Sequence, residues 1–494
     1  MQAIDYHAIL PELIISGTLL LVLMVDAFLP ARRAWAVMWL GLFGAIAALA
    51  ATLTLVGDTR STFGGMFVVD DFAVLFKVFF LIVAIAVLAL SLRYFREGGY
   101  YQGEYYYLLL TAFLGCLLMP SSRDLLMLFL ALELVSAPGF LIAAFRKADP
   151  RSNEAGLKFF LIGVLSTAVM LYGMSMIYGI TGGKTRLNEI AAALAGPLGN
   201  AESLAVASIL FVVVGFAFKV SAVPFQFWAP DTYEGAPVPV ATFLATASKA
   251  AGFAGLLQLM FVAFVNQAEF WTPIFAGLSI LTMTLGNLIA LRQTQVVRLL
   301  AYSSIAQAGY MLLPFALVSV DDPGVNDAAF SAAIVYILIY SVMTLGAFAV
   351  VIAMSRGSRG LLISDFAGLV RRAPVLAVAM TVFMISLAGI PPTGGFWAKF
   401  VIFRAAIDAG GVGPWLAVVM LVNSVISLVY YLVIPKQMLL VDGELADAGE
   451  PVTPMRTPVL VGGVVLIATL GVLAIGIYPD LVAKFPSMSG LVGG

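Results

Sequence analysis

The chain has 494 residues, of which 62% are hydrophobic and only 11% are charged, whereas an ordinary soluble domain carries roughly 25% charged residues. We therefore expect a membrane protein. The net charge of −1 provides no basic field to attract nucleic acid, so nucleic-acid binding is excluded. One cysteine, Cys116, and one histidine, His7, cannot ligate an iron–sulfur cluster or a bis-histidyl haem. We expect neither a cofactor nor a metal in this chain.

Apolar runs long enough to cross a bilayer, about 20 residues each, recur along the whole sequence. They lie near residues 9–29, 34–56, 72–92, 105–119, 124–145, 157–180 and 203–222, and then near 240–264, 271–291, 298–318, 329–354, 374–407, 415–434 and 457–478. The expected fold class is therefore an all-α polytopic membrane protein with fourteen transmembrane helices. The segments between these runs are too short to hold a soluble domain.

Basic residues are distributed unevenly over the loops. Fifteen of the 26 lysines and arginines lie in loops that follow odd-numbered spans, among them Arg32, Arg33, Arg356 and Arg359, whereas five, including Lys484, lie in the other loops and the tails. Cytoplasmic loops of membrane proteins carry an excess of Lys and Arg. We therefore predict that the odd loops are cytoplasmic and that both termini face outward.

Six basic residues remain inside the predicted spans, and five of them are lysines. A charged side chain at the centre of a membrane helix costs about 2.5–3.5 kcal/mol. Arginine stays protonated, whereas a buried lysine can lose its proton and so can carry protons. Lys77, Lys158 and Arg404 could instead extend their charged groups to the membrane surface. The candidate carriers are therefore Lys219, Lys249 and Lys399, with Lys158 as a weaker candidate.

Two spans contain helix breakers beside a lysine. Pro224 follows Lys219 in span 7, and span 12 contains Pro391, Pro392, Gly394 and Gly395 before Lys399. A proline inside a helix removes a hydrogen bond and breaks the helix. Both breaks are followed by Phe-Trp-Ala. The two broken spans, 7 and 12, are five spans apart, and because this number is odd, they enter the membrane from opposite sides. The pattern predicts two inverted repeats with broken helices that line an ion path.

Glu133 is the only acidic residue that the sequence places deep in a span, and it needs a partner of opposite charge. At 4 Å and an effective dielectric constant near 20, a lysine would attract it by about 4 kcal/mol. We therefore expect Glu133 to pair with a lysine and to influence its protonation. The alternative is a static ion pair that only locates two helices.

Polar side chains on two other spans could connect the lysines. Ser303, Gln307 and Tyr310 share a face of span 10 at helical spacing, and Thr242 and Thr246 share a face of span 8 with Lys249. Hydroxyl and amide groups of this kind hold water and relay protons, but they also join neighbouring helices. The sequence leaves both roles open.

Three stretches closely resemble the antiporter-like subunits of respiratory complex I. They are Pro-Phe-Gln-Phe-Trp-Ala-Pro-Asp-Thr-Tyr-Glu-Gly-Ala-Pro-Val-Pro-Val between Lys219 and Lys249, Arg-Leu-Leu-Ala-Tyr-Ser-Ser-Ile-Ala-Gln-Ala-Gly from Arg298, and Gly-Ile-Pro-Pro-Thr-Gly-Gly-Phe-Trp-Ala-Lys up to Lys399. The resemblance extends over essentially the whole chain. Within this family, the motif that begins at Asp231 and the 16 residues after Tyr478 are most similar to subunit N of the bacterial NADH:quinone oxidoreductase.

The resemblance implies a proton-translocating subunit with N-terminal helices in residues 1–104, a first five-helix repeat in 105–264, an inverted second repeat in 265–440, and a C-terminal loop, helix and short tail in 441–494. Glu133 and Lys219 match the first-half ion pair of the family. Lys249 matches its central lysine, and Lys399 matches the lysine of its second broken helix. These matches imply that protons enter from the cytoplasm near Lys219, pass Lys249, and leave outward from Lys399.

The resemblance also implies an enzyme subunit of the bacterial inner membrane, with periplasmic termini and no redox centre of its own. NADH, FMN, iron–sulfur clusters and quinone are expected in partner subunits. The implied partners are the other membrane subunits of complex I, including antiporter-like paralogues, together with membrane lipids. Two alternatives stay open on the sequence: a subunit of a multisubunit cation/proton antiporter, which shares these motifs, and a structural membrane scaffold that transports nothing.

Overall fold

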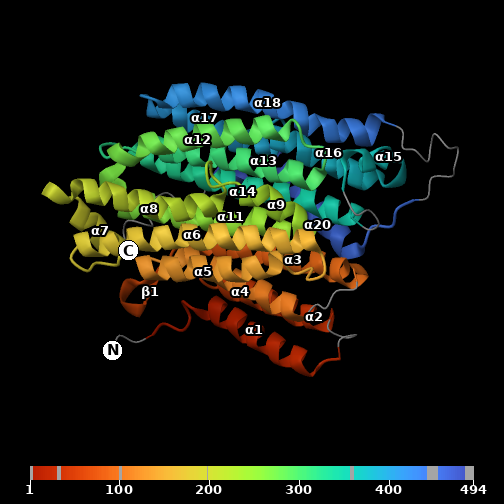
Figure 1. Cartoon of the computed structure of the whole chain (residues 1–494), viewed down its shortest axis with the longest axis horizontal. Helices are drawn as coiled ribbons and strands as arrows, with labels where there is room; N and C mark the ends of the chain where they lie inside the picture. Colours follow the sequence, from red (N-terminus) through yellow and green to blue (C-terminus); the bar gives the residue numbers. More distant parts are fainter. Residues whose placement is uncertain are drawn as a thin grey trace.

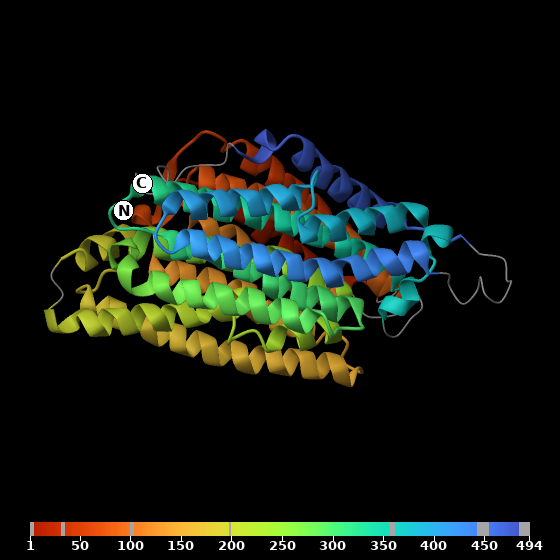
Figure 2. The ribbon, with the colours of Figure 1, turned by 90° about the horizontal axis from the view of Figure 1, so that it is seen from above.

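A computed structural model describes residues 4–30, 35–98, 103–196, 199–355, 361–441 and 454–483. In this part of the chain nearly all residues are helical, and the long helices run side by side along one direction (Figure 1). Seen from above, they keep this common direction, and α6, in gold, lies along one edge of the bundle (Figure 2). The chain therefore forms a layered helical bundle.

The elements follow one another along the chain without a separate soluble domain among the described residues. The helices are α1 (Leu10–Phe28), α2 (Val37–Leu53), α3 (Asp71–Gly98), α4 (Gly103–Ser121), α5 (Leu125–Ala143), α6 (Pro150–Ile180), α7 (Leu187–Leu194), α8 (Glu202–Val220), α9 (Trp228–Gly235), α10 (Val238–Phe243), α11 (Lys249–Gln258), α12 (Ala268–Ala290), α13 (Val296–Leu312), α14 (Pro323–Met354), α15 (Leu369–Arg372), α16 (Pro374–Ala388), α17 (Gly394–Ala409), α18 (Gly413–Leu440), α20 (Val459–Ile477) and α21 (Asp480–Ala483). Strands β1 (Arg60–Thr62) and β2 (Phe67–Val69) form a small antiparallel hairpin.

The predicted spans correspond one by one to these helices. In the described residues, eleven helices are long and apolar enough to cross a membrane, and one of them is the continuous segment Val238–Ala263 that contains α10 and α11. The other three predicted spans are α2, α4 and the pair formed by α16 and α17. The prediction of an all-α, multi-pass membrane protein is confirmed.

Loops that follow even-numbered spans meet at one end of the bundle, and loops that follow odd-numbered spans meet at the other. The backbones of Asp124 and Arg186 form an isolated antiparallel β-bridge at the end that carries β1 and α7. Those of Gln295 and Leu362 form another at the end that carries α15 (Figure 1). We call these the hairpin end and the α15 end. The alternation expected from the span count is therefore present, although Arg32, Arg33, Arg356, Arg359 and Lys484 lie outside the described residues.

Burial varies with position in the bundle. The segment that contains α10 and α11 is completely buried and α14 is mostly buried, whereas α1, α6 and α20 expose most of their apolar side chains. A helix that is apolar on all sides is suited either to the core of a large bundle or to lipid. The central helices therefore form the buried interior of the protein, which the outer helices surround.

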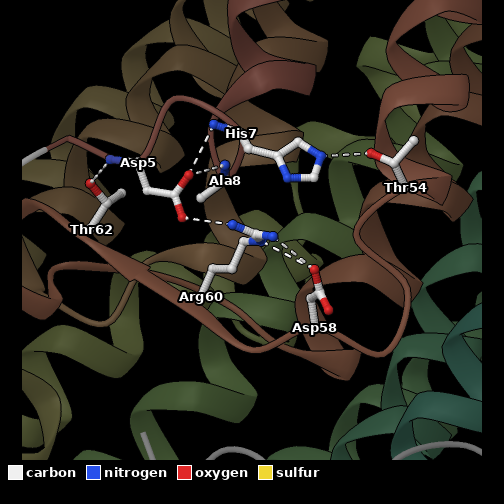
Figure 3. Close-up of polar contacts among 7 residues, drawn as sticks. All are labelled: Asp5, His7, Ala8, Thr54, Asp58, Arg60 and Thr62. Carbon is white, nitrogen blue, oxygen red and sulfur yellow. Dashed lines mark hydrogen bonds and ion pairs between the residues drawn. The ribbon is translucent and has the colours of Figure 1, made fainter.

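The segment before α1 is attached to the hairpin end through Asp5 (Figure 3). The Asp5 carboxylate accepts hydrogen bonds from Arg60 Nη1 at 3.1 Å and from the backbone amides of His7 at 3.0 Å and Ala8 at 3.2 Å. The hydrogen bond from Arg60 and those from the two amides lower the pKa of Asp5 below its ordinary value of 3.8. The attachment is therefore present above pH 3.8 and is lost as the pH falls below that value.

We predict that Asp5→Ala removes the hydrogen-exchange protection of the His7 and Ala8 amides at pH 7. In the parent chain the same protection should disappear only below pH 3.8, when the carboxylate takes up a proton. The control is Asp58→Asn, because Asp58 binds the same Arg60 but does not bind these amides. Unchanged protection in Asp5→Ala would show that the carboxylate does not hold the segment.

Candidate functional site

The first helix break lies between α8 and α9. Helix α8 ends at Val220, Ser221 adopts a left-handed conformation with φ of 62°, and the Ala222 amide donates to the Ala217 carbonyl at 2.8 Å. Such bonds satisfy the carbonyls that a helix leaves free at its C-terminal end. Pro224 follows within the break, and from α9 the Trp228 indole nitrogen donates back to the Phe218 carbonyl at 3.2 Å. The break is thus a closed, hydrogen-bonded turn inside the bundle.

The second break lies between α16 and α17 and has a related construction. Helix α16 ends at Ala388, and Gly389 adopts a left-handed conformation with φ of 88°. Pro391 and Pro392 stand between the helices, and α17 begins at Gly394. The Gly395 amide donates to Ser386 Oγ at 3.0 Å, and a Cβ at this glycine would come within 1.8 Å of the Ser386 carbonyl oxygen. Only glycine allows the two helices to approach this closely.

The two broken helices enter the bundle from opposite ends. Helix α8 follows α7 from the hairpin end, whereas α16 follows α15 from the α15 end (Figure 1). Their lysines also differ in position, because Lys219 precedes the first break and Lys399 follows the second. The two breaks therefore bring one amine each to the interior from opposite directions.

Lys219 lies one residue before the end of α8 and is only 2% exposed. Its amine donates to Ser136 Oγ of α5 at 3.0 Å. Its aliphatic chain packs on Gly252 of α11, where an added Cβ would lie 2.9 Å from Lys219 Cγ. The amine is therefore held by a hydroxyl group in a space that a larger residue at position 252 would close.

Glu133 lies one turn before Ser136 on α5, and it does not contact Lys219 directly. Its carboxylate accepts a hydrogen bond from Thr167 Oγ1 at 2.9 Å, and within the part of the chain that the structure describes it forms no ion pair. The direct pair expected from the sequence is absent because the Ser136 hydroxyl is the group that meets the amine. The charges of Glu133 and Lys219 still interact over a longer distance.

Lys249 is the first residue of α11 and follows the π-helical segment Leu244–Ser248. It is 2% exposed, and its amine donates to the Ser304 carbonyl at 2.8 Å and to Ser304 Oγ at 2.6 Å. The hydroxyls of Tyr233 and Tyr340 lie close to Ser304. The amine of Lys249 therefore lies in a buried polar region at the surface of α13.

Lys399 folds back from α17 onto the end of α16. Its amine donates to the Ala388 carbonyl at 2.8 Å and lies 5.0 Å from the centre of the Tyr310 ring. The Ala388 carbonyl is free for this bond because α16 ends there, and a cation at the C-terminal end of a helix is stabilised by the helix dipole. The second break thus creates the acceptor for Lys399.

Polar residues of α13 join the second lysine to the second break. Ser303 and Gln307 both bond the Tyr431 hydroxyl, at 2.5 and 2.9 Å, and the Gln307 amide also donates to the Leu387 carbonyl at 3.1 Å. Leu387 precedes Ala388, the residue that binds Lys399. The network therefore extends from α13, whose Ser304 binds the Lys249 amine, to the Leu387 carbonyl of α16. The next carbonyl, that of Ala388, binds Lys399.

Tyr310 belongs to a neighbouring group of buried amides and hydroxyls. Asn287 donates to the Tyr310 hydroxyl at 3.2 Å and accepts from the Tyr430 hydroxyl at 2.8 Å. Asn287 also donates to Asn423, whose amide donates to Thr284 Oγ1 at 3.2 Å. The three residues expected to share a face of span 10 therefore all lie in buried polar groups, but Tyr310 belongs to a different group from Ser303 and Gln307.

A profile of the family described as NADH:quinone oxidoreductase/Mrp antiporter, TM, matches residues 122–427, which include both helix breaks. NADH-quinone oxidoreductase subunit N of Trichlorobacter lovleyi is 40% identical over 485 residues, which cover 98% of this chain and 96% of that protein. The chain belongs to the family of NADH-quinone oxidoreductase subunit N.

Two solved structures resemble this chain over nearly its whole length. A chain of respiratory complex I from Thermus thermophilus with bound aureothin is 32% identical, with a TM-score of 0.78 over 96% of this chain and 98% of that chain. A chain of the Mrp complex from Dietzia sp. DQ12-45-1b has a TM-score of 0.82 over 99% and 98% of the two chains but is only 20% identical. The second comparison shows a shared fold.

Two further basic residues, Lys158 and Arg404, lie outside the buried polar regions. Lys158 is 43% exposed and forms ion pairs with Glu154 at 2.6 Å and Asp231 at 2.7 Å. Arg404 is 75% exposed and pairs with Asp408 at 3.4 Å. The structure therefore places Lys158 in a half-exposed ion network instead of a dry interior.

Lys77 is completely buried, and its amine pairs with Glu12 at 2.9 Å. Glu12 is 5% exposed, so protein covers a second carboxylate, although it lies in the first turn of α1 and not in the middle of a span. Glu12 comes at the start of α1, where the sequence pattern cannot distinguish a side chain at the membrane surface from one that a neighbouring helix covers. Lys77 therefore does not extend to the membrane surface.

Several groups of the polar regions had no signal of their own in the sequence. Ser136, Ser304 and Tyr431 bond the lysines or their links, yet single hydroxyls are common in membrane helices. Thr242 and Thr246, which do share a face with Lys249, donate instead to carbonyls of their own helix at 2.8 and 2.7 Å. The threonines therefore do not bridge Lys219 and Lys249 directly.

We predict that Gly389→Ala destabilises the protein more than Gly182→Ala does. Both glycines have positive φ, of 88° and 68°, which costs an L-residue roughly 1–2 kcal/mol. At Gly389 the added Cβ also lies 2.8 Å from Lys399 Cδ, whereas at Gly182 it meets nothing within 4 Å. Thermal unfolding of the two solubilised variants provides the test, and equal losses would contradict a close contact at Gly389.

Proposed function

We propose that the chain translocates protons across the bacterial inner membrane as a subunit of NADH-quinone oxidoreductase. The observation that carries this proposal is the environment of three buried lysines. The amines of Lys219, Lys249 and Lys399 are held by hydroxyl and carbonyl oxygens. None of the three forms an ion pair with a carboxylate in the described part of the chain.

The neutral oxygens matter because they let an amine change its charge. If a lysine paired with a carboxylate loses its proton, an unpaired buried anion remains, which is costly. A lysine held by hydroxyl and carbonyl oxygens leaves no such anion, and a hydroxyl can donate to the neutral amine as readily as it accepts from the ammonium. Burial itself favours the neutral form of a lysine. These three lysines are therefore suited to bind and release protons.

The proposed route passes the three lysines in the order Lys219, Lys249 and Lys399. A proton enters from the cytoplasm near Lys219, whose charge interacts with that of Glu133, and passes to Lys249. From Lys249 it passes along Ser303 and Gln307 of α13, through water held by buried hydroxyls, to Lys399 near Tyr310. It leaves toward the periplasm. Lys158 has at most a role before Lys219, because it lies in the half-exposed ion network.

The broken helices support an arrangement of two inverted repeats in residues 105–264 and 265–440, between N-terminal helices in 1–104 and a C-terminal part in 441–494. In this arrangement Pro224 ends the first broken helix, and Pro391, Pro392, Gly394 and Gly395 shape the second. The excess of basic residues in the odd loops favours a cytoplasmic α15 end. The hairpin end and both termini then face the periplasm.

The proposal assigns the redox chemistry to other subunits. NADH, FMN, iron–sulfur clusters and quinone would bind to partner chains of the enzyme, and quinone reduction there would supply the free energy for proton movement. The partners are the other membrane subunits, including antiporter-like paralogues, with lipids around the outer helices. This chain then contributes to the enzyme as a translocase subunit.

We predict that Lys219→Ala, Lys249→Ala and Lys399→Ala each lower the number of protons moved per NADH oxidised by the assembled complex. Lys249→Arg should have the same effect, because arginine keeps the charge but does not release its proton. Proton uptake and NADH oxidation are measured together in membrane vesicles. The control is Lys436→Ala, since Lys436 is exposed. Normal ratios in all four site variants would refute the proposed route.

The Mrp-like fold makes a cation/proton antiporter subunit the second candidate function. That candidate predicts sodium-dependent proton exchange by a complex that contains no NADH dehydrogenase. Purification from gently solubilised membranes decides between the two, because the proposed enzyme should copurify with subunits that oxidise NADH. A structural scaffold predicts that the lysine variants affect assembly alone.

A further inference from the structure

Three buried aromatic side chains pack together at the last turn of α8, the turn that carries Lys219. Phe159 stacks on Trp228 with ring centres 4.2 Å apart, and Phe218 lies 5.3 Å from Trp228 and 5.8 Å from Phe159. Their exposed fractions are 0%, 2% and 3%. We call Phe159, Trp228 and Phe218 the aromatic cluster. It is dry, and each member comes from a different helix.

The aromatic cluster is connected to Lys219 on one side. Phe218 is the residue before Lys219 on α8, and its carbonyl accepts the hydrogen bond from the Trp228 indole. Trp228 thus belongs to α9 but is fixed to the last turn of α8. A movement of Trp228 would therefore change the packing around the residue that precedes the buried amine.

On its other side the aromatic cluster is connected to a half-exposed ion network. Asp231, one turn after Trp228 on α9, binds Lys158 Nζ at 2.7 Å and Arg298 Nη1 at 2.8 Å. Lys158 is the residue before Phe159 on α6, and Arg298 also binds Glu234 at 2.8 Å. We call the contacts of Asp231 with Lys158 and Arg298 the Asp231 latch. The latch joins the same two helices, α6 and α9, whose rings stack in the aromatic cluster.

We propose that the aromatic cluster is a gate between cytoplasmic water and Lys219, and that the Asp231 latch holds this gate closed. Asp231 is then a positioning residue, because it acts on α9 and Trp228 through Lys158 and Arg298 and does not contact Lys219. The inference rests on the proposed function in one respect, the movement of protons through Lys219. The barrier to water that the gate imposes can be measured independently of transport.

The aromatic cluster is suited to exclude water and the Asp231 latch is suited to control it, because the two differ in physical character. Stacked rings exclude water by contact, and a buried aromatic pair contributes about 0.5–1.5 kcal/mol beyond its area. The ion network is 30 to 43% exposed at Asp231, Arg298 and Lys158, so it responds to protonation and to neighbouring charges. A latch of this kind can therefore be released by a change of charge at the α15 end, whereas the rings alone cannot respond to charge.

Cys116 provides a natural reporter of water near Lys219. It is the one cysteine of the chain, it is completely buried, and its thiol interacts electrostatically with Lys219. While the gate is closed, a small water-soluble thiol reagent should modify Cys116 slowly. The rate of modification in the assembled complex, read by mass spectrometry of this chain, therefore measures opening of the gate.

The test compares Asp231→Asn with Glu154→Gln. Both remove one negative charge near Lys158, but Glu154 is 62% exposed and does not bind α9. We expect Asp231→Asn to increase the rate of Cys116 modification by roughly three- to tenfold, since two half-exposed ion pairs are lost. Glu154→Gln should leave the rate unchanged. Equal rates in Asp231→Asn and the parent, or equal increases in both variants, would overturn the proposal.

A second measurement tests whether the opened gate leads to Lys219. In liposomes without NADH, Asp231→Asn should raise passive proton leakage, and Lys219→Ala added to it should abolish the increase. Leakage that persists in the double variant would show that water enters elsewhere and would overturn the gate. If Lys219→Ala alone pumps normally while Cys116 still responds to Asp231→Asn, the transport route fails and the gate over the buried pocket stands.

Discussion

The central constraint on this structure is the need to keep amino groups inside a membrane without neutralising them by carboxylates. A charged group in a dry interior requires hydrogen-bonding partners. Ser136, Ser304 and the Ala388 carbonyl provide these partners for the three lysines. Each partner is uncharged, so the loss of a proton from one of these amines leaves no unpaired carboxylate behind. Lys77, by contrast, pairs with the Glu12 carboxylate at 2.9 Å.

The helix breaks follow from the same constraint. The carbonyls inside an unbroken helix already accept internal hydrogen bonds, whereas a helix that ends inside the bundle leaves its last carbonyls without an internal donor. Proteins tolerate such ends in membranes only where other protein groups or water satisfy them. At the second break the lysine itself does so, and Gly389 and Gly395 leave the space that its chain and the next helix require. The broken helix and the lysine thus stabilise each other.

The sequence predicts the helices better than it predicts the partners of the lysines. Fourteen apolar runs and the breaks at Pro224 and Pro391 depend on local composition, and the structure has a helix or a helix end at each of them. The partner of Lys249 depends instead on which face of α13 meets α11. Ser303, with Gln307, meets Tyr431, while the adjacent Ser304 meets Lys249. Adjacent residues on a helix point in directions about 100° apart, so only packing could assign their roles.

Helix α13 connects parts of the molecule that lie far apart in sequence. Its first turn carries Arg298, which binds Asp231 and Glu234 of α9, and its middle carries Ser304 and Gln307, which bind Lys249 and the end of α16. One continuous helix therefore joins the half-exposed ion network around Asp231 to the polar environments of both Lys249 and Lys399.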